Sequence, residues 1–280
     1  TVLQREVREV MAEVDLLVGN PENAAGLEFT LQGPELRFRR PALVALTGAS
    51  FSEAPRWRPF EVGAGAVLRL GSAQAGCRGY LAIACGIDVA PVLGSRSTYV
   101  RAGLGGWKGR VLREGDLLPV VEVRRVVRPH WRIDERILPK YAPEPVVRVV
   151  AGAQAGEFDA SWMERSYRVS AHSDRMGMRL TGAAIERTRS ADLISSPMAP
   201  GAIQVPPDGQ PIVLLADAQT VGGYPVIAHV ATVDLPLMAQ LRPGDNVRFR
   251  VVTLADAREI FAARERALAL LHEGLAQKLA

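Results

Sequence analysis

Short apolar runs separated by turn residues dominate the chain. Residues 78–85 form an apolar run bounded by glycine, residues 226–233 are rich in β-branched side chains, and residues 247–251 alternate apolar with charged positions. Similar runs lie at 42–46, 66–70, 117–123, 146–150 and 212–216, and Gly, Pro, Asp or Ser residues separate them. Runs of this length and spacing predict an all-β barrel or sandwich.

One segment follows a helical period instead. From Thr253 to Leu279 the chain is rich in Ala, Leu and Glu. The larger apolar side chains of this segment share one helix face: Phe261, Leu268, Leu271, Leu275 and Leu279. Thr253 and Asp256 have the spacing of an N-terminal cap. We therefore expect a mainly β fold with a C-terminal α-helix.

Three short motifs occur twice, in the same order and at similar spacing. They are Leu-Thr-Gly-Ala at 46–49 and 180–183, Gly-Ala plus a β-branched residue at 65–67 and 201–203, and Leu-Arg-x-Gly-Asp at 112–116 and 241–245. Each Gly-Asp pair is typical of a tight turn before a strand. The repeats predict two related β-barrel halves, 1–140 and 141–280, joined through the proline-rich stretch 128–145. A ligand site is expected where such halves meet.

Composition and charge narrow the function classes. The 280 residues carry a formal net charge of +4 that is spread along the chain, with no nucleic-acid reading motif, so a nucleic-acid partner is not expected. We find no uncharged apolar run long enough for a membrane span and no secretory signal pattern. The two cysteines have no C-x-x-C spacing, which favours a reduced cytoplasmic location without a disulfide framework.

Familiar catalytic and metal motifs are absent from the sequence. The glycine-rich stretch 103–110 lacks the spacing and the hydroxyl residue of a phosphate-binding P-loop. The histidines share no metal-ligand spacing, and they are His130, His172, His229 and His272. We therefore expect no metal site.

Three polar segments nevertheless carry candidate chemistry. The first is the glycine-flanked stretch 94–106, whose hydroxyls and guanidinium groups could hold a carboxylate or phosphate. Its candidate binding residues are Ser95, Arg96, Ser97, Thr98 and Arg101. The alternative is a turn-rich connection whose arginines are solvated.

The second segment covers residues 170–180. His172 and Asp174 are two positions apart, so on a strand they would face the same side and could share a proton. Arg175 follows directly and could stabilise charge. The alternative is an Asp174–Arg175 turn with His172 on the surface.

The third segment covers residues 201–224. Its glutamines and aspartate can pair with the donors and acceptors of an amide or lactam, and its glycines allow close ligand approach. The candidate binding residues are Gln204, Asp217, Gln219, Thr220, Gly222, Gly223 and Tyr224. The Pro-Pro-Asp-Gly stretch at 206–209 is explained by a turn alone.

Five stretches together resemble one known family. Residues 79–88, 93–98, 173–177, 201–209 and 219–225 are similar to the KipA family, also called allophanate hydrolase subunit 2, biotin-dependent carboxyltransferase or the C subunit of 5-oxoprolinase. The resemblance runs from about Leu17 to Asp256. It implies tandem cyclophilin-like β-barrels and a KipI-type partner (allophanate hydrolase subunit 1). Ala218 stands where the family usually has arginine, and residues 1–5 resemble a remnant of its N-terminal motif.

The resemblance implies three activities. Most bacterial pairs, with a third lactam-handling subunit, resemble an ATP-dependent 5-oxoprolinase that opens pyroglutamate to glutamate. In urea amidolyase the equivalent region moves carboxylate from biotin to urea. In spore-formers a member antagonises an inhibitor of a histidine kinase. This chain has no Met-Lys-Met biotin-attachment segment and no ATP-grasp-like region, so a self-sufficient carboxylase is not expected.

We favour a subunit of an ATP-dependent 5-oxoprolinase that acts with a KipI-type partner on a small anionic amide or lactam. ATP would be bound by the complex. A carboxyltransferase component and a non-catalytic regulatory binding protein remain the alternatives. In the favoured hypothesis the segment at 95–101 binds the anionic group, His172, Asp174 and Arg175 serve proton transfer and charge stabilisation, and the segment at 204–224 orients the amide.

Overall fold

The computed structural model describes residues 14–21, 23–51, 54–121, 133, 138, 140–189 and 193–279. The expected N-terminal motif remnant, His130 and most of the proposed joint lie outside these residues. The chain divides into two compact units. One comprises Arg8–Leu138 with Leu270–Ala280, here the N-terminal unit, and the other comprises Thr1–Val7 with Pro139–Ala269, here the C-terminal unit.

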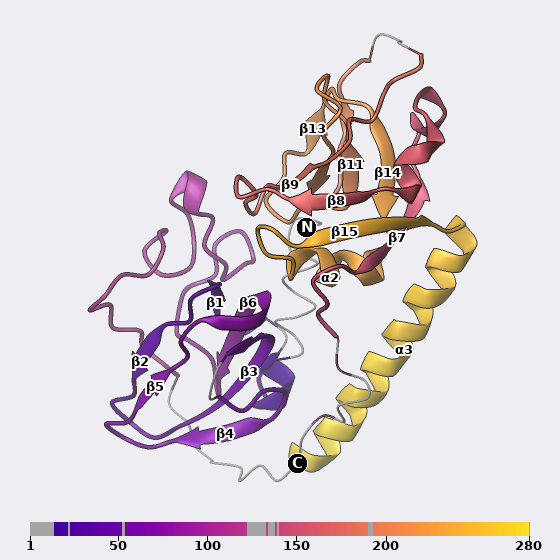
Figure 1. Cartoon of the computed structure of the whole chain (residues 1–280). Coiled ribbons are helices and arrows are strands. Elements are labelled where there is room, and N and C mark those ends of the chain that lie inside the picture. Colours follow the sequence, from indigo (N-terminus) through magenta and orange to yellow (C-terminus); the bar gives the residue numbers. More distant parts are fainter. Residues whose placement is uncertain are drawn as a thin grey trace. The chain divides into compact units, whose positions relative to one another are not determined.

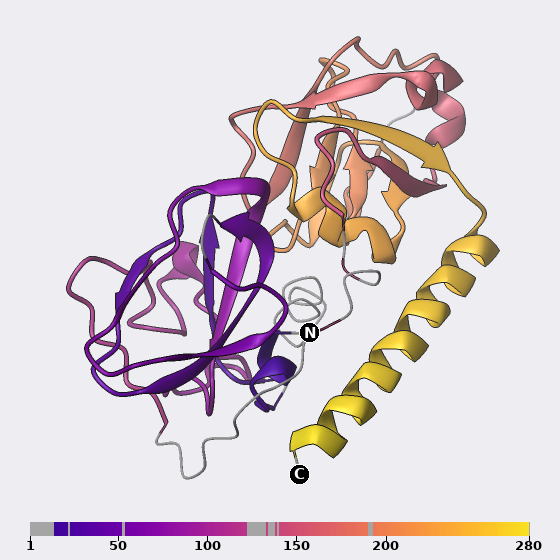
Figure 2. The same ribbon diagram turned by 60° about the horizontal axis from the view of Figure 1, so that its bottom comes forward.

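Seven strands close into a barrel in the C-terminal unit (Figure 1). Their order around the barrel is β11-β12-β9-β8-β15-β7-β14. The bounds are β7 Val146–Ala151, β8 Ser166–Val169, β9 Gly177–Thr181, β11 Ala202–Gln204, β12 Ile212–Leu214, β14 Val226–Val230 and β15 Asn246–Val251. Strands β7 and β15 run parallel and side by side (Figure 2), and the other neighbours are antiparallel. The predicted mainly β fold with a C-terminal helix is confirmed.

The C-terminal unit also contains shorter elements outside the barrel. They are the two-stranded sheet of β10 (Ser196–Pro197) and β13 (Val221–Gly222), the 3-10 helices η4 (Ala155–Glu157), η5 (Ala160–Glu164) and η6 (Thr232–Asp234), and the helix α2 (Leu235–Ala239).

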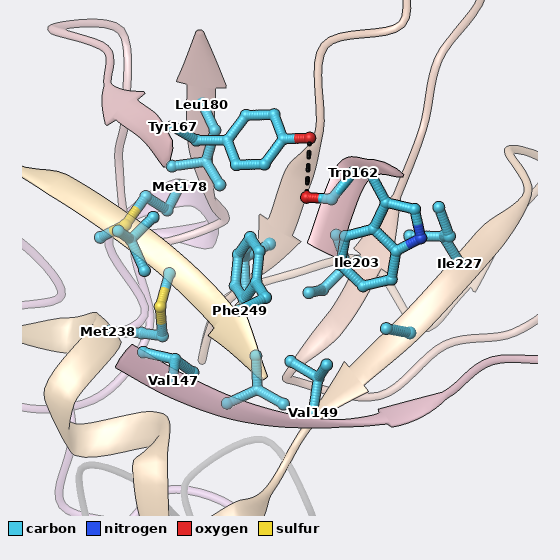
Figure 3. Close-up of a cluster of buried hydrophobic side chains, with 14 of the residues drawn as sticks. Val147, Val149, Trp162, Tyr167, Met178, Leu180, Ile203, Ile227, Met238 and Phe249 are labelled. Atoms are coloured by element: carbon cyan, nitrogen blue, oxygen red, sulfur yellow. Dashed lines mark hydrogen bonds between the residues drawn. The ribbon is translucent and has the colours of Figure 1, made fainter. Parts of the chain in front are cut away.

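The barrel is filled by apolar side chains that alternate along the strands (Figure 3). In β15 the period of two directs Val247 and Phe249 inward while their neighbours stay exposed. The ring of Phe249 lies 6.0 Å from the rings of both Trp162 and Tyr167. The Tyr167 hydroxyl donates to the Trp162 carbonyl at 3.3 Å, and burial raises the pKa of Tyr167 to about 12. A close-packed interior of this kind gives the surrounding loops a rigid base.

The N-terminal unit contains a four-stranded sheet in the order β1-β6-β3-β4 and a separate pair, β2 with β5. The bounds are β1 Leu27–Thr30, β2 Glu35–Arg37, β3 Ala42–Phe51, β4 Pro59–Val62, β5 Val67–Arg69 and β6 Ala73–Ile83. The prediction of a strand at 117–123 is wrong for its described part. Only Val120 takes part in pairing there, in an isolated bridge to Ile87. Pro119 has no amide hydrogen for a ladder.

The repeated Leu-Arg-x-Gly-Asp motif forms the same turn twice, as predicted. Gly115 and Gly244 have φ values of 84° and 94°. The Asp116 carboxylate accepts the backbone N–H of Arg113 at 2.8 Å. In the second copy a carboxylate in the same place accepts the N–H of Arg242, also at 2.8 Å. A left-handed glycine and a carboxylate that accepts the N–H of the residue three positions earlier therefore account for this motif.

Helix α3 spans Leu254–Leu279 and begins with the predicted cap. The Asp256 N–H donates to Thr253 Oγ1 at 3.1 Å, and the Thr253 N–H donates back to Asp256 Oδ2 at 3.3 Å. This reciprocal pattern satisfies two orphan donors of the first turn. Among the described helices, none combines the length and the apolar character that crossing a bilayer requires.

A helical turn at 14–17 buries Asp15 in the N-terminal unit. Its Oδ1 accepts from Asn20 Nδ2 at 2.8 Å, while its Oδ2 has no hydrogen-bond partner among the described residues. Asn20 also donates to the Ile83 carbonyl at 2.9 Å and accepts the Cys85 N–H at 2.6 Å. Burial raises the pKa of Asp15 to about 7, and the Asn20 bond opposes this rise only in part.

Substitution Asp15→Asn should stabilise the chain more strongly as pH rises. Asp15 ionises near pH 4 in the unfolded chain but only near pH 7 in the folded chain. The native protein therefore loses stability between about pH 4 and pH 7. An asparagine has no proton to lose. The stabilisation measured by urea unfolding should grow by about 2–3 kcal/mol between pH 5 and pH 8. A pH-independent difference between the two proteins would contradict this account.

Candidate functional site

Two loops meet at one end of the paired strands β9 and β12 in the C-terminal unit. The Arg175 guanidinium contacts the Asp217 carboxylate, with Nε–Oδ2 at 2.8 Å and Nη2–Oδ1 at 3.4 Å. The Asp217 N–H donates to the Arg175 carbonyl at 2.9 Å, and the Leu215 N–H donates to the Met176 carbonyl at 3.0 Å. The Arg175 side chain is still 40% exposed, so its charge can be reached from solvent.

A buried amide lies beside the second of these loops. Gln204, at the end of β11, is 2% exposed. Its Oε1 lies 3.5 Å from Gln219 Nε2, and its Nε2 lies 3.5 Å from the sulfur of Met198. The contact with Gln219 is at the long limit for a hydrogen bond between nitrogen and oxygen, whereas the sulfur contact has an ordinary length. Since an amide has two N–H donors and an oxygen with two lone pairs, Gln204 keeps capacity for a ligand donor or acceptor.

Gly222 makes room for this amide. A Cβ at this position would lie 2.7 Å from Gln204 Nε2 and 3.1 Å from Met198 Cγ. Gly222 pairs with Ser196 across the small sheet of β10 and β13, and the Met198 N–H donates to the Thr220 carbonyl at 2.8 Å. The chain backbone therefore passes close to Gln204 only because residue 222 has no side chain.

His172 and Asp174 lie in the same loop as Arg175 but make separate contacts. Asp174 Oδ1 accepts the N–H groups of Met176 and Gly177 at 2.8 and 3.1 Å. His172 Nδ1 lies 3.4 Å from Ser170 Oγ, and both of these side chains are outside the core. Asp174 thus shapes the turn that presents Arg175, and its role in proton transfer stays a prediction.

Tyr224 and Gly223 line a groove of about 750 Å³ in the C-terminal unit. The other lining residues are Phe158, Ala184, Ile185, Glu186, Arg187, Leu193, Val205, Pro206, Pro207, Asp208, Gly209 and Pro225. Arg187 is held by Glu157, with Nε–Oε2 at 2.9 Å. The Pro-Pro-Asp-Gly stretch forms its predicted turn, through the Gly209 N–H bonded to the Pro206 carbonyl at 2.9 Å, and also borders the groove.

The first polar segment lies in the N-terminal unit and uses several of its polar groups internally. Ser95 Oγ accepts the Ser97 N–H at 3.1 Å, and Arg96 Nη1 donates to the Asn23 carbonyl at 3.0 Å. Arg101 belongs to the short 3-10 helix η2 (Val100–Ala102) and is exposed. Binding of an anion by this segment stays a prediction.

Residues 8–251 match the family model described as carboxyltransferase domain, subdomain A and B. The chain belongs to this family.

Relatives of the chain include C subunits of 5-oxoprolinase and a urea amidolyase. The chain is 38% identical over 254 residues to the C subunit of 5-oxoprolinase from Escherichia coli, and the match covers 87% of this chain and 80% of that protein. The Haemophilus influenzae protein of the same name is 35% identical, with coverage of 88% and 81%. The urea amidolyase of Lachancea kluyveri is 29% identical over 94% of this chain, which corresponds to 16% of that protein.

A solved structure shows the same fold. The urea carboxylase of Kluyveromyces lactis superposes with a TM-score of 0.85 at 27% identity, over 95% of this chain and 26% of that chain.

The family resemblance implies ATP, and the glycine-rich loop at 103–110 is the natural place to look for its cradle. A Cβ at Gly105 would overlap the Ser97 carbonyl, one at Gly106 would overlap the Thr98 side chain, and one at Gly109 would overlap the Gly103 carbonyl. These glycines therefore allow the stretch 103–110 to pack closely against itself and against Ser97 and Thr98. They do not fit a phosphate cradle, so no step is assigned to nucleotide bound at this loop. Within the described residues, no group of three or more His, Cys, Asp and Glu side chains could hold a metal ion.

The structure adds residues that the sequence did not point to. Met198 contacts the Gln204 amide, and Ser196 pairs with Gly222. Phe158 and Arg187 border the groove. None belongs to a polar motif of the family pattern, and only their position near the third segment in the fold reveals them.

Substitution of Asp174 separates a turn-forming role from an acidic one. Asp174→Ala removes the acceptor for two backbone N–H groups and should destabilise the protein by about 1–2 kcal/mol. Asp174→Asn keeps a carbonyl acceptor and should lose less than half of that. Urea unfolding of both variants measures the difference. No destabilisation by alanine would show that the turn does not depend on this oxygen, and equal destabilisation by both variants would show that it needs the carboxylate charge.

Proposed function

We propose that this chain is a subunit of an ATP-dependent 5-oxoprolinase that acts with a KipI-type partner and a lactam-handling subunit. The observation that carries the proposal is the 38% identity to the C subunit of the Escherichia coli 5-oxoprolinase along 80% of that protein. The site geometry supports a cyclic amide as the ligand, for two reasons that lie in its glutamines and in Arg175.

The two glutamines suit the polar edge of a lactam. A lactam presents an N–H and a carbonyl side by side, and a side-chain amide offers the complementary acceptor and donor. Gln204 is buried, and Gln219 lies next to it on an exposed loop. Gln204 would fix the orientation of the ring while Gln219 adjusts to it.

Arg175 suits the charge that develops when the ring opens. Attack on a lactam carbonyl places negative charge on its oxygen, and a fixed guanidinium stabilises such charge. The Arg175 Nε–H donates to the Asp217 carboxylate, which orients the guanidinium, and the side chain stays 40% exposed. ATP bound by the complex would supply the driving force for opening an unreactive amide. His172, exposed in the same loop, would exchange protons with solvent.

Carboxyl transfer is the second candidate. The TM-score of 0.85 with a urea carboxylase over 95% of this chain favours it. In that reaction the same amide-binding side chains would hold the acceptor amide while a separate biotinylated carrier delivers the carboxylate. A regulatory binding role is the third candidate, and it requires a partner but no turnover.

Reconstitution with the KipI-type and lactam-handling subunits should give pyroglutamate-dependent release of ADP and glutamate. Gly222→Ala places a methyl group against Gln204 and should lower kcat/KM about tenfold, with little loss of stability because a side-chain end can shift. Gly156→Ala is the matched control, since its Cβ would meet no atom within 4 Å. It should leave kcat/KM within twofold of the unmodified value.

The outcomes separate the three candidates. No turnover with all subunits present overturns the 5-oxoprolinase proposal. Incorporation of bicarbonate into urea or another amide, only when a biotinylated carrier is added, supports carboxyl transfer. Complex formation without either reaction supports the regulatory role.

A further inference from the structure

The groove of about 750 Å³ in the C-terminal unit takes no part in the proposed reaction. That reaction uses Gln204, Gln219 and Arg175, and none of these residues lines the groove. All of the lining residues belong to the C-terminal unit, so the groove is built within one compact body. A hollow of this volume is typical of small-molecule sites. The groove therefore calls for a ligand of its own.

The floor of the groove is apolar and continuous with the barrel core. Phe158, Ile185 and Val205 line the groove and also belong to the buried core, with exposed fractions of 7%, 4% and 3%. Side chains in a close-packed core keep their positions. The floor therefore offers a fixed apolar surface to a ligand.

Backbone hydrogen bonds join the chain segments that form the walls. The Ile185 N–H donates to the Gly209 carbonyl at 2.9 Å, and the Val205 N–H donates to the Pro225 carbonyl at 3.0 Å. A Cβ on Gly209, whose φ is 72°, would lie 2.9 Å from Ala184 Cβ, so two walls meet this closely only because residue 209 is glycine. Three of the lining residues are prolines, which fix φ. The groove is therefore formed before a ligand arrives, which lowers the entropic cost of binding.

Negative charge without an internal counter-ion lies beside this apolar floor. Glu186 and Asp208 line the groove, and neither forms an ion pair with a described residue. Asp208 Oδ1 accepts the Gln210 N–H at 3.0 Å. Arg187 is the one basic residue among the described lining residues, and its Nε–H donates to the Glu157 carboxylate at 2.9 Å, which balances its charge. The groove therefore favours a cation and disfavours a carboxylate such as that of pyroglutamate.

Tyr224 adds an aromatic wall that suits the same charge. Its residue lines the groove together with the two carboxylates. The face of an aromatic ring attracts a protonated amine, and an apolar floor stabilises the carbon body that carries the amine. Charge and apolar surface thus point to one class of ligand.

We propose that this groove binds a small organic cation, in which a protonated amine is carried on an apolar or aromatic body. The amine lies toward Glu186 and Asp208, and the body lies on the floor formed by Phe158, Ile185 and Val205. The volume falls in the range of small-molecule pockets, which favours a free small molecule over a protein segment. This site does not rest on the proposed function, because its ligand carries the charge opposite to that of pyroglutamate.

The test is a titration of the full chain with phenethylamine, followed by NMR of the ligand signals. Phenethyl alcohol and phenylpropionate are the matched neutral and anionic probes. The amine should bind about tenfold more tightly than the alcohol, and the propionate should bind more weakly than the alcohol. Added salt should weaken the binding of the amine and leave that of the alcohol unchanged.

Two groove variants and one control locate the bound amine. Asp208→Asn removes one carboxylate but keeps the oxygen that accepts the Gln210 N–H, and should raise the dissociation constant of the amine about threefold. Tyr224→Leu keeps an apolar side chain without a ring and should also raise it about threefold. The control Glu164→Gln removes an exposed carboxylate of η5 that does not line the groove, and should leave the constant unchanged.

Three results would overturn the proposal. Equal affinity for the amine and the alcohol shows that the carboxylates do not select the ligand. Amine binding that both groove variants leave unchanged places the amine elsewhere on the chain. Absence of amine binding at concentrations well above a millimolar excludes an organic-cation site. None of these results bears on pyroglutamate turnover by the reconstituted complex, so the proposed function stands or fails separately.

Discussion

The candidate site of the C-terminal unit depends on the ion pair between Arg175 and Asp217. These residues belong to loops before β9 and after β12, and the pair is reinforced by the Asp217 N–H bonded to the Arg175 carbonyl. The pair orients the guanidinium while leaving it partly exposed. It also fixes the start of the loop that carries Gln219 toward the buried amide of Gln204. A charge and two amides are thereby presented from one rigid barrel.

Local interactions explain which parts of the fold could be predicted from the sequence. The Gly115–Asp116 turn and the cap of α3 close within a few residues, so their motifs indicate them directly. The prediction of a strand at 117–123 is wrong for its described part, although the apolar pattern there is typical of a strand. Pro119 has no N–H to donate to a ladder.

The site was only partly predictable for a different reason. Residue types in the three polar segments pointed to anion and amide chemistry, but the partner of each side chain depends on the tertiary fold. Arg175 and Asp217 are 42 positions apart, and their pairing follows from the register of β9 with β12. Asp174 was expected to work with His172, yet its carboxylate binds two backbone N–H groups, as the common Asx turn does.

A double-mutant cycle of Arg175→Gln and Asp217→Asn in the reconstituted complex tests the central claim most directly. If the ion pair acts as one unit, Arg175→Gln removes the guanidinium and Asp217→Asn misplaces it, so either single substitution lowers kcat/KM about tenfold. The double variant then loses no more than either single one. Losses that multiply to about a hundredfold in the double variant would contradict the account, because the two residues would then act independently.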